Sequence, residues 1–424
     1  MNKTRLSYHL IRIFTYPIGF LPYRVIHLIG KGIGNICYYF LKNYRKRALS
    51  NLSSAKDLNL NEKELKRVAI RSFQNLAINV LEYPKLSKEK DFSNLVRCLN
   101  PEKAQELFDK KKGIIFFCGH QANWEVLFLD GNLRMRGIAI GKPIKNKRLY
   151  KWIVSIREKT GGKIVIPQNA LKEGLRALKK GHFMGIVGDQ GMPSSNYSFP
   201  FLGRRAWNST APALLAYKTN CPIIVATTLR EKGKYYITYS DPIYPNLEKP
   251  LEEEVIRLMN EALEILQNSI KEKLGQWLWQ HNRWKGQTPR NVYKRFRHDT
   301  IRIIMPDDRK EFKKILIDLP TIKSIYKKDF ISISVPRRFK SKIDIKVDEI
   351  KGYSNLKECL DKDYRFKLIF NFSSLKGVKK HFKKLSAYEV LTKKDIYKIA
   401  SLNQNKPLSS FSDALYVALC RNKG

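Results

Sequence analysis

The residues of this chain best suited to chemistry lie together in the segment Gly119-His120-Gln121-Ala122-Asn123-Trp124-Glu125. The apolar run at residues 113–118 precedes it, so His120 is expected where a buried strand ends and a helix begins. His120 and Glu125 are five positions apart, which in a regular helix separates them by roughly 140°. They can therefore meet only if His120 lies in the turn and Glu125 on the first helical turns. A carboxylate there can hold one imidazole nitrogen and leave the other free to take a proton from an alcohol that attacks a thioester.

The pattern around this segment predicts the elements that position it. Helical patterns at 124–133, 149–159, 170–180 and 210–219 alternate with short apolar runs at 113–118, 163–166, 183–187, 222–228 and 235–239. Such alternation predicts an α/β fold with a central mixed sheet flanked by helices, and residues 251–274 predict one long amphipathic helix. Asp189 and Gln190 follow one of these apolar runs, so we expect them at the same edge of the sheet as His120.

Residues 8–41 are apolar but are interrupted by Arg24 and Lys31. A spanning helix needs about 20 predominantly apolar residues, and neither uninterrupted run reaches that length. We expect helices that lie in the membrane interface, or a hydrophobic hairpin; the alternative is an ordinary buried helix pair. Because the basic residues 45–47 follow directly and would meet lipid head groups, residues 1–45 are interpreted as a membrane-associating segment.

The charge of the chain is extreme. Its 424 residues include 81 Lys and Arg against 38 Asp and Glu, a net charge of +43. A field of this size favours nucleic acid, an anionic bilayer, phosphorylated lipid or an acidic carrier protein as partner. The six cysteines are scattered without a C-x-x-C pair, which indicates reduced thiols rather than disulfides or a zinc site. No metal or cofactor is expected, and no G-x-S-x-G motif supports a serine acyl-enzyme.

Residues 291–424 differ from the rest of the chain. Apolar runs recur at 301–305, 330–335 and 366–372, with lysine-rich helical patterns between them. They predict a small basic α/β domain at the C-terminus, to which the sequence assigns no role.

The segment around His120 resembles the signature of the bacterial lipid A biosynthesis acyltransferases, the late acyltransferases that add lauroyl- or myristoyl-type chains. Further blocks resemble the family in the same order along about residues 10–290: 141–146, 157–161, 181–191, 199–204, 219–222 and 276–285. The family usually has arginine where Lys142 stands, and Leu202 and Arg205 depart from its pattern as well. We therefore expect three parts: the membrane-associating segment 1–45, an acyltransferase domain at 46–290 that the resemblance implies, and the basic domain at 291–424, which lies outside the resemblance.

The resemblance also implies a reaction. His120 would be the general base and Glu125 its orienting partner, in transfer of a fatty acyl group from an acyl carrier protein or coenzyme A thioester to a hydroxyl of a lipid A precursor. Trp124 would pack in the core or line the acyl chain. The residues expected to contact substrate are Asn123, Lys142, Asp189, Gln190 and Arg204.

Several of these roles have a structural alternative. Asn123 would otherwise bond the backbone at the helix start, and Lys142 would hold a phosphate, stabilise an oxyanion or be exposed. Asp189 and Gln190 would shape the site or serve as buried hydrogen-bonding groups. Arg204 lies in a basic loop that suits a lipid phosphate, and it would otherwise simply be exposed.

The expected partners are an acyl carrier protein or acyl-CoA donor, a phosphorylated glycolipid acceptor and an anionic membrane, and no nucleic acid. The expected location is the cytoplasmic face of the inner membrane of a Gram-negative-type bacterium. One alternative is an acyltransferase for another glycolipid or phospholipid. The other is a basic protein that binds nucleic acid or anionic membranes, against which the lack of a zinc-finger or RNP motif counts.

Overall fold

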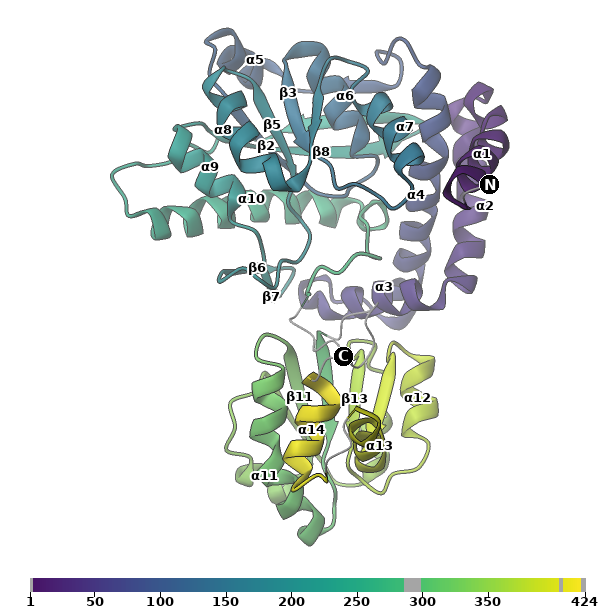
Figure 1. Cartoon of the computed structure of the whole chain (residues 1–424), viewed down its shortest axis with the longest axis vertical. Coiled ribbons are helices and arrows are strands. Elements are labelled where there is room, and N and C mark those ends of the chain that lie inside the picture. Colours follow the sequence, from purple (N-terminus) through teal and green to yellow (C-terminus); the bar gives the residue numbers. More distant parts are fainter. Residues whose placement is uncertain (1–2, 286–298, 404–406, 421–424) are drawn as a thin grey trace.

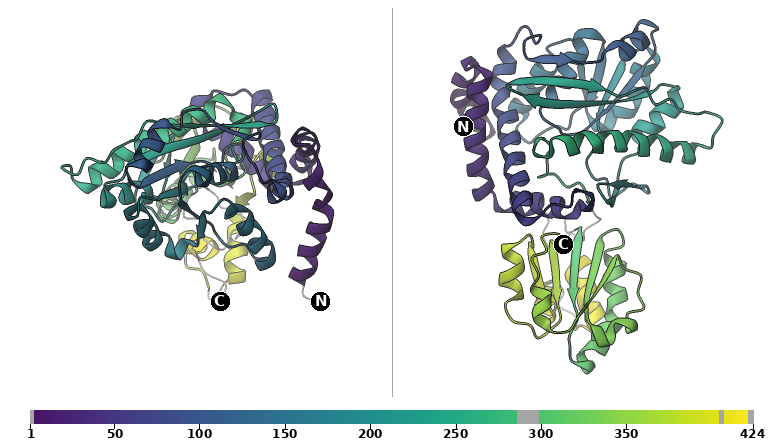
Figure 2. Two further views of the ribbon diagram at one scale, coloured as in Figure 1. Left: turned by 90° about the horizontal axis from the view of Figure 1, so that it is seen from above. Right: turned by 180° about the vertical axis from the view of Figure 1, so that it is seen from behind.

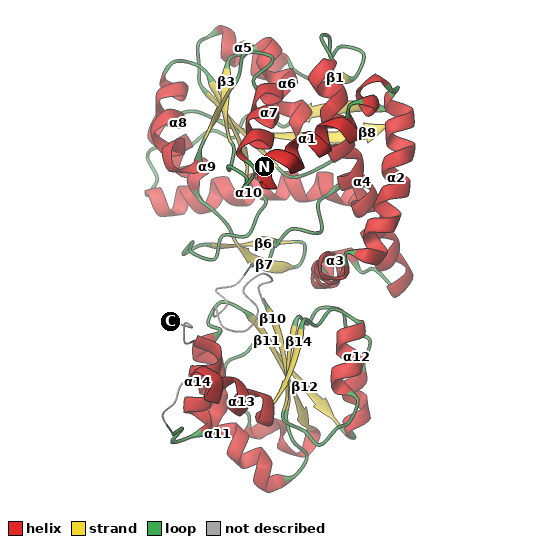
Figure 3. Cartoon of the chain, turned by 45° about the vertical axis from the view of Figure 1, so that its right-hand side comes forward, coloured by secondary structure: helices red, strands yellow, loops and turns green. Residues whose placement is uncertain are grey.

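The computed structural model describes residues 3–285, 299–403 and 407–420, which form two α/β parts stacked along the long axis of the molecule (Figures 1 and 3). The N-terminal part comprises residues 3–285 and the C-terminal part residues 299–420. The domain boundary expected at residue 290 lies outside the described residues, and the one expected at residue 45 falls within a helix, α3 (Lys42–Ser54).

The chain begins with helices on the flank of the N-terminal part: α1 (Lys3–Thr15), η1 (Pro17–Phe20), α2 (Tyr23–Phe40), α3, η2 (Lys56–Leu58) and the long α4 (Glu62–Lys88). Helix α2 packs against α4 (Figure 2). The contact is close because α2 presents glycines to it: a Cβ on Gly34 would lie 2.3 Å from the Cα of Gln74, and one on Gly30 would lie 2.6 Å from Ile78. The two glycines are four residues apart and so share one face of α2.

Large apolar side chains of α1, η1 and α2 are exposed. They include Ile13, Phe14, Phe20, Leu28, Ile36, Tyr39 and Phe40. We call this set, on α1, η1 and α2, the apolar flank. Within the part of the chain that the structure describes, no helix has the length and apolar character needed to cross a membrane.

The sheet of the N-terminal part has seven strands in the order β1-β9-β8-β2-β5-β3-β4. Neighbouring strands are parallel except β8 and β9, so the sheet is mixed, as predicted. The strands are β1 (Val96–Cys98), β2 (Ile114–Cys118), β3 (Gly137–Ile140), β4 (Lys163–Val165), β5 (Phe183–Val187), β8 (Ile223–Glu231) and β9 (Lys234–Tyr239). The predicted apolar runs match five of these; β1 and β3, only three and four residues long, were not predicted.

Helices cover both faces of this sheet, because alternate strand residues point to opposite sides. Ile115, Phe117 and Ile223 pack on one face with α8 (Ala170–Lys179), α9 (Ala211–Thr219) and α10 (Leu251–Glu272). Ile114 and Phe116 pack on the other with α5 (Glu102–Asp109), α6 (Glu125–Arg134) and α7 (Lys147–Arg157). The long helix expected at 251–274 is α10, and it runs under the sheet (Figure 2).

A small hairpin, β6 (Ser198–Phe201) with β7 (Arg204–Trp207), lies between the two parts of the molecule (Figure 1). Its two-residue turn places Leu202 and Gly203 at φ 49° and 79°, the left-handed geometry that tight hairpins require.

The C-terminal part is a five-stranded parallel sheet in the order β12-β11-β10-β13-β14. Its strands are β10 (Thr300–Ile304), β11 (Phe330–Pro336), β12 (Glu349–Tyr353), β13 (Leu368–Asn371) and β14 (Glu389–Thr392). The helical elements around it are α11 (Arg309–Ile325), η5 (Arg337–Lys342), η6 (Leu356–Leu360), α12 (Val378–Lys384), α13 (Lys393–Asn403) and α14 (Phe411–Cys420). The three predicted apolar runs are β10, β11 and β13.

The C-terminal part contacts α3 at the start of its strands. Ser50 Oγ donates to the Arg365 carbonyl oxygen at 2.6 Å, and Lys46 Nζ donates to the Ala387 carbonyl oxygen at 2.6 Å. Arg204 of the hairpin donates to the Asp299 carbonyl oxygen at 2.9 Å. The carboxyl ends of these strands therefore face away from the N-terminal part.

Candidate active site

His120 lies just beyond the end of β2, and its closest partner is Asp189, just beyond the end of the neighbouring strand β5. His120 Nδ1 is 2.6 Å from Asp189 Oδ1, and the His120 backbone N–H donates to Asp189 Oδ2 at 2.7 Å. The two residues meet because β2 and β5 are parallel neighbours that end at the same edge of the sheet. The predicted placement of Asp189 beside His120 is thus found, and the contact is a direct hydrogen bond.

Asp189 is completely buried. Trp277 Nε1 donates to Asp189 Oδ2 at 2.7 Å, so that oxygen accepts two N–H donors while the other faces the imidazole. Burial alone would raise the pKa of Asp189, but the interaction with His120 outweighs it and holds the pKa below its ordinary value. The carboxylate is therefore ionised at neutral pH.

A second histidine, His281, lies behind Asp189. Its Nε2 is 3.3 Å from the Asp189 carbonyl oxygen, and its ring centroid is 5.7 Å from that of His120. Burial lowers the pKa of His281 to about 4, so this side chain is neutral at pH 7 and serves in the packing.

The other nitrogen of His120 faces outward. Because the Nδ1–H donates to Asp189, Nε2 carries the lone pair and can accept a proton. Gln190 Nε2 is 3.5 Å from it, and the Trp124 ring meets the imidazole edge-on at a centroid distance of 4.7 Å. The His120 side chain is 15% exposed, enough for a reacting group to reach it.

Glu125 has other partners than the one predicted. Arg157 of α7 grips its carboxylate with two hydrogen bonds, Nε to Oε2 at 2.7 Å and Nη2 to Oε1 at 2.6 Å. Tyr83 of α4 donates a third, to Oε1 at 2.7 Å. Burial alone would raise the pKa of Glu125, but the charge of Arg157 lowers it. Glu125 is thus an ionised, buried anchor between α4, α6 and α7.

The structure therefore differs from the sequence prediction in which carboxylate contacts the imidazole. The reason is geometric: Glu125 is the first residue of α6 and points toward α4 and α7, whereas the strand beside β2 brings Asp189 to the ring. Arg157 was noted in the sequence only as part of a family block, and Tyr83 was not singled out.

The loop that carries His120 is held by polar residues on one face of α4. Asn75 Nδ2 donates to the Ala122 carbonyl oxygen at 3.1 Å, and Asn79 Nδ2 also donates to it. Ala122 itself has φ 45°. These contacts fix a strained turn, and the sequence signal that could have revealed them is the run of buried polar residues at 75, 79 and 82 on α4.

Asn123 is completely buried and holds the start of α6. Its Oδ1 accepts from the Glu125 backbone N–H at 3.1 Å, and its Nδ2 donates to Glu82 at 2.6 Å. Glu82 also accepts from Tyr235 and lies 2.5 Å from His27 of α2. Asn123 therefore bonds the backbone at the start of the helix, which was the structural alternative. Its contact with substrate stays a prediction.

The other two predicted substrate contacts are the cations Lys142 and Arg204. Lys142 is exposed on the loop after β3. Arg204 lies between the two parts of the molecule, where it donates to Ser54 and to the Asp299 carbonyl oxygen. Burial lowers the pKa of Arg204. The structure brings together His120, Asp189 and Gln190. Lys142 follows β3, a parallel strand of the same sheet that ends at the same edge, whereas Arg204 lies at the contact with the C-terminal part.

An apolar pocket opens beside Trp124 and runs between α6 and the sheet. It is lined by Phe116, Cys118, Trp124, Leu127, Phe128, Gly131, Ala139, Phe183, Gly185, Val187, Ala226 and Tyr239. Cys118 faces this pocket, and burial raises its pKa above the ordinary range, so the thiol is not an activated nucleophile. Among the described residues, no group of three His, Cys, Asp or Glu side chains could hold a metal ion.

A polarised histidine beside an apolar pocket suits acyl transfer, and two comparisons bear on it. The family model described as bacterial lipid A biosynthesis acyltransferase matches residues 3–286. The lipid A biosynthesis lauroyltransferase of Escherichia coli (strain K12) is 24% identical over 287 residues, which cover 65% of this chain and 90% of that protein. The family match spans more than half of the chain and includes the whole site. The chain therefore belongs to the bacterial lipid A biosynthesis acyltransferase family and is an acyltransferase.

Proposed function

We propose that this enzyme transfers a fatty acyl group from a carrier thioester to a hydroxyl of a lipid A precursor, with His120 as general base and Asp189 as the residue that orients it. The observation that carries the proposal is the hydrogen bond of 2.6 Å between His120 Nδ1 and Asp189, next to Trp124, which lines an apolar pocket. It leaves Nε2 unprotonated and directed toward the substrate side.

In the proposed reaction, His120 Nε2 takes the proton of the acceptor hydroxyl as its oxygen attacks the thioester carbonyl carbon. The tetrahedral intermediate collapses by breaking the carbon–sulfur bond, and the imidazolium returns its proton to the leaving thiolate. Asp189 stabilises the imidazolium between these two transfers. Gln190, 3.5 Å from Nε2, is proposed to donate to the thioester oxygen as negative charge develops on it.

Glu125 is proposed to act as a positioning residue. Its two hydrogen bonds with Arg157 and one with Tyr83 tie three helices together immediately after the loop that carries His120. This proposal replaces the direct contact with the imidazole that the sequence suggested, and it keeps both residues of the family motif essential for different reasons.

The acyl chain is proposed to occupy the apolar pocket beside Trp124, which would place its thioester carbon next to His120. The donor is proposed to be acyl carrier protein or coenzyme A. An acidic carrier would be steered by the net charge of +43, as would a phosphorylated glycolipid acceptor. The apolar flank of α1, η1 and α2 supports attachment to a membrane surface, proposed to be the cytoplasmic face of the inner membrane.

The test is transfer of a labelled acyl group from acyl carrier protein to a lipid A precursor by membranes that contain the protein. We expect His120→Ala to lose transfer by orders of magnitude while it remains folded and membrane-bound. His182→Ala is the matched control, because His182 lies at the opposite end of β5. Equal transfer by the parent and His120→Ala would overturn the mechanism, and transfer only to another lipid would overturn the acceptor.

A further inference from the structure

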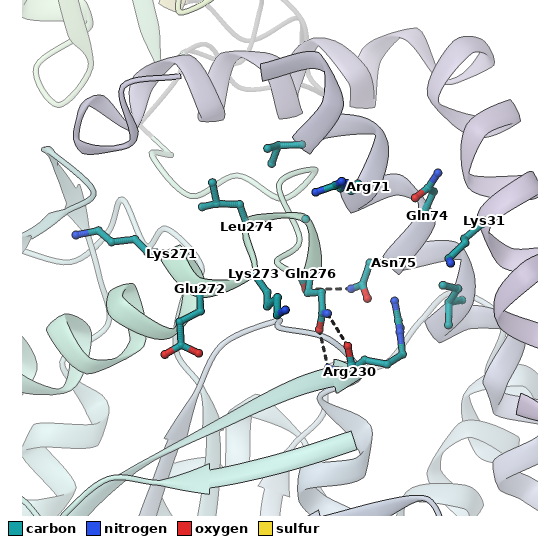
Figure 4. Close-up of a pocket in the computed structure, with 13 residues that line it drawn as sticks. Lys31, Arg71, Gln74, Asn75, Arg230, Lys271, Glu272, Lys273, Leu274 and Gln276 are labelled. Atoms are coloured by element: carbon teal, nitrogen blue, oxygen red, sulfur yellow. Dashed lines mark hydrogen bonds between the residues drawn. The ribbon is translucent and has the colours of Figure 1, made fainter. Parts of the chain in front are cut away.

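A basic pocket lies behind the catalytic loop, among α2, α4, the turn between β8 and β9, and η4 (Leu274–Gln276) (Figure 4). It consists of two adjoining hollows of about 490 and 580 Å³, which share Lys31, Ile78, Arg230 and Gln276 in their walls. His120, Asp189 and Gln190 do not line it.

The walls of this basic pocket are strongly cationic. Glu272 is the sole acidic residue that lines the two hollows. No carboxylate in the described ranges is within ion-pair distance of Arg24, Lys31, Arg71 or Arg230, whereas Lys273 pairs with Glu231 at 3.1 Å. Uncompensated cations around a concave surface attract a compact anion, and guanidinium groups suit phosphate because they donate in a planar fork. The lining cations are Arg24, Lys31, Arg71, Arg230, Lys232 and Lys273, with Lys271 at the edge.

The position of the basic pocket identifies the source of the anion. Arg24 and Lys31 lie on α2, the helix whose Leu28 and Ile36 belong to the apolar flank. A protein that rests on a bilayer through this flank brings these cations to the depth of the lipid head groups. A phosphate attached to a lipid thus meets both surfaces together, which a soluble anion does not.

The basic pocket is also joined to the catalytic loop. Gln276 accepts the Ala122 backbone N–H at 2.7 Å through its carbonyl oxygen, and its side chain makes two hydrogen bonds of 2.8 Å with the Arg230 backbone. Asn75, in the same wall, donates to the Gln276 carbonyl oxygen (Figure 4). It also donates to the Ala122 carbonyl oxygen. One wall of the basic pocket is therefore the back of the turn that follows His120.

We infer that this basic pocket binds the phosphate head group of an anionic membrane phospholipid, at a site separate from the acceptor. Gln276 and Asn75, which hold the Ala122 turn, form part of the wall of this pocket, so a bound head group supports the turn through them. The effect on transfer rests on the function proposed above; the binding itself does not.

The experiment compares Lys31→Gln/Arg71→Gln with the parent in binding to vesicles of phosphatidylcholine alone or with about a third phosphatidylglycerol. Both residues are exposed, so the substitutions leave the core intact. We expect binding to anionic vesicles to fall by about thirtyfold, the attraction expected of two cations near an anionic surface, and binding to neutral vesicles to be unchanged. The control, Lys112→Gln/Lys180→Gln, removes the same charge outside the basic pocket and should lose less than about threefold.

Further arms separate the possible occupants. In neutral detergent micelles, KM for the phosphorylated acceptor should be the same for the variant and the parent. Equal losses in the variant and its control would overturn the proposal. A raised KM of the variant for the acceptor with unchanged vesicle binding would also overturn it, as would weaker binding of acyl carrier protein by the variant. Displacement of the parent protein from vesicles by inorganic phosphate at constant ionic strength would overturn it as well. Vesicle binding is measured without substrates, so a failure of the proposed reaction would not obscure the result.

Discussion

Replacement of Asp189 by asparagine tests the central feature of the site. The two oxygens of Asp189 have different hydrogen-bond partners. Oδ2 accepts from the His120 backbone N–H and from Trp277 Nε1, each at 2.7 Å, and Oδ1 faces His120 Nδ1. In Asp189→Asn the amide oxygen must take the place of Oδ2, because an NH₂ there would face two donors in a buried site. The amide NH₂ then faces Nδ1 and donates to it.

This exchange forces His120 into the tautomer that carries its proton on Nε2, the nitrogen that must accept one. It also removes the carboxylate that stabilises the imidazolium. In the Ser-His-Asp triad of serine proteases, the same exchange lowers kcat by about 10⁴-fold. A range of about 10³- to 10⁴-fold corresponds to roughly 4–5.5 kcal/mol of transition-state stabilisation. We expect a loss in this range here, with KM for donor and acceptor little changed.

The assay is steady-state acyl transfer, with folding checked by circular dichroism and thermal unfolding. Asp130→Asn is the matched control, since Asp130 is also buried but pairs with Arg134 on α6. If Asp189→Asn kept activity within about tenfold of the parent while Glu125→Gln lost a thousandfold, Glu125 would be the orienting residue and the reasoning from the hydrogen bonds would be refuted.

Three further predictions concern the surroundings of His120. Glu125→Ala leaves Arg157 buried without its partner and should lower the free energy of unfolding, measured by urea denaturation, by about 3 kcal/mol. Adding Arg157→Leu should restore part of this loss. Losses that simply add in the double variant would contradict the pairing. Gly131→Val adds bulk to the apolar pocket beside Trp124, where even a Cβ would contact Phe183 at 3.4 Å. At about 0.8 kcal/mol for each methylene displaced, kcat/KM should shift toward shorter acyl chains by about tenfold. An unchanged chain-length profile would show that the acyl chain binds elsewhere. The pKa of His281 is about 4 in the folded protein, below its ordinary value, so the unfolded chain takes up a proton first as pH falls. Between pH 7 and pH 5 this residue should therefore lower the free energy of unfolding by about 2 kcal/mol. His281→Gln should not show this loss in parallel urea titrations.

The sequence by itself was sufficient to predict the layered fold. Apolar runs and helical periodicity depend on neighbours within about ten residues, so the strands around His120 and the helix α10 could be predicted from local pattern alone. The ordered motif blocks likewise indicated the family, and the strand-end positions predicted that Asp189 and Gln190 would lie beside His120.

Only the tertiary structure decided which side chains are in contact. Glu125 and Asp189 are both carboxylates near His120, and the choice between them depends on which strand lies beside β2 and on the direction in which α6 leaves the loop. These are long-range properties, set by packing between residues about 70 positions apart, which local periodicity does not encode. The placement of Arg204 at the contact with the C-terminal part, and the gathering of cations from α2, α4, β8 and η4 into one pocket, have the same cause: the residues are distant in sequence and meet only when the sheet and its helices close around them.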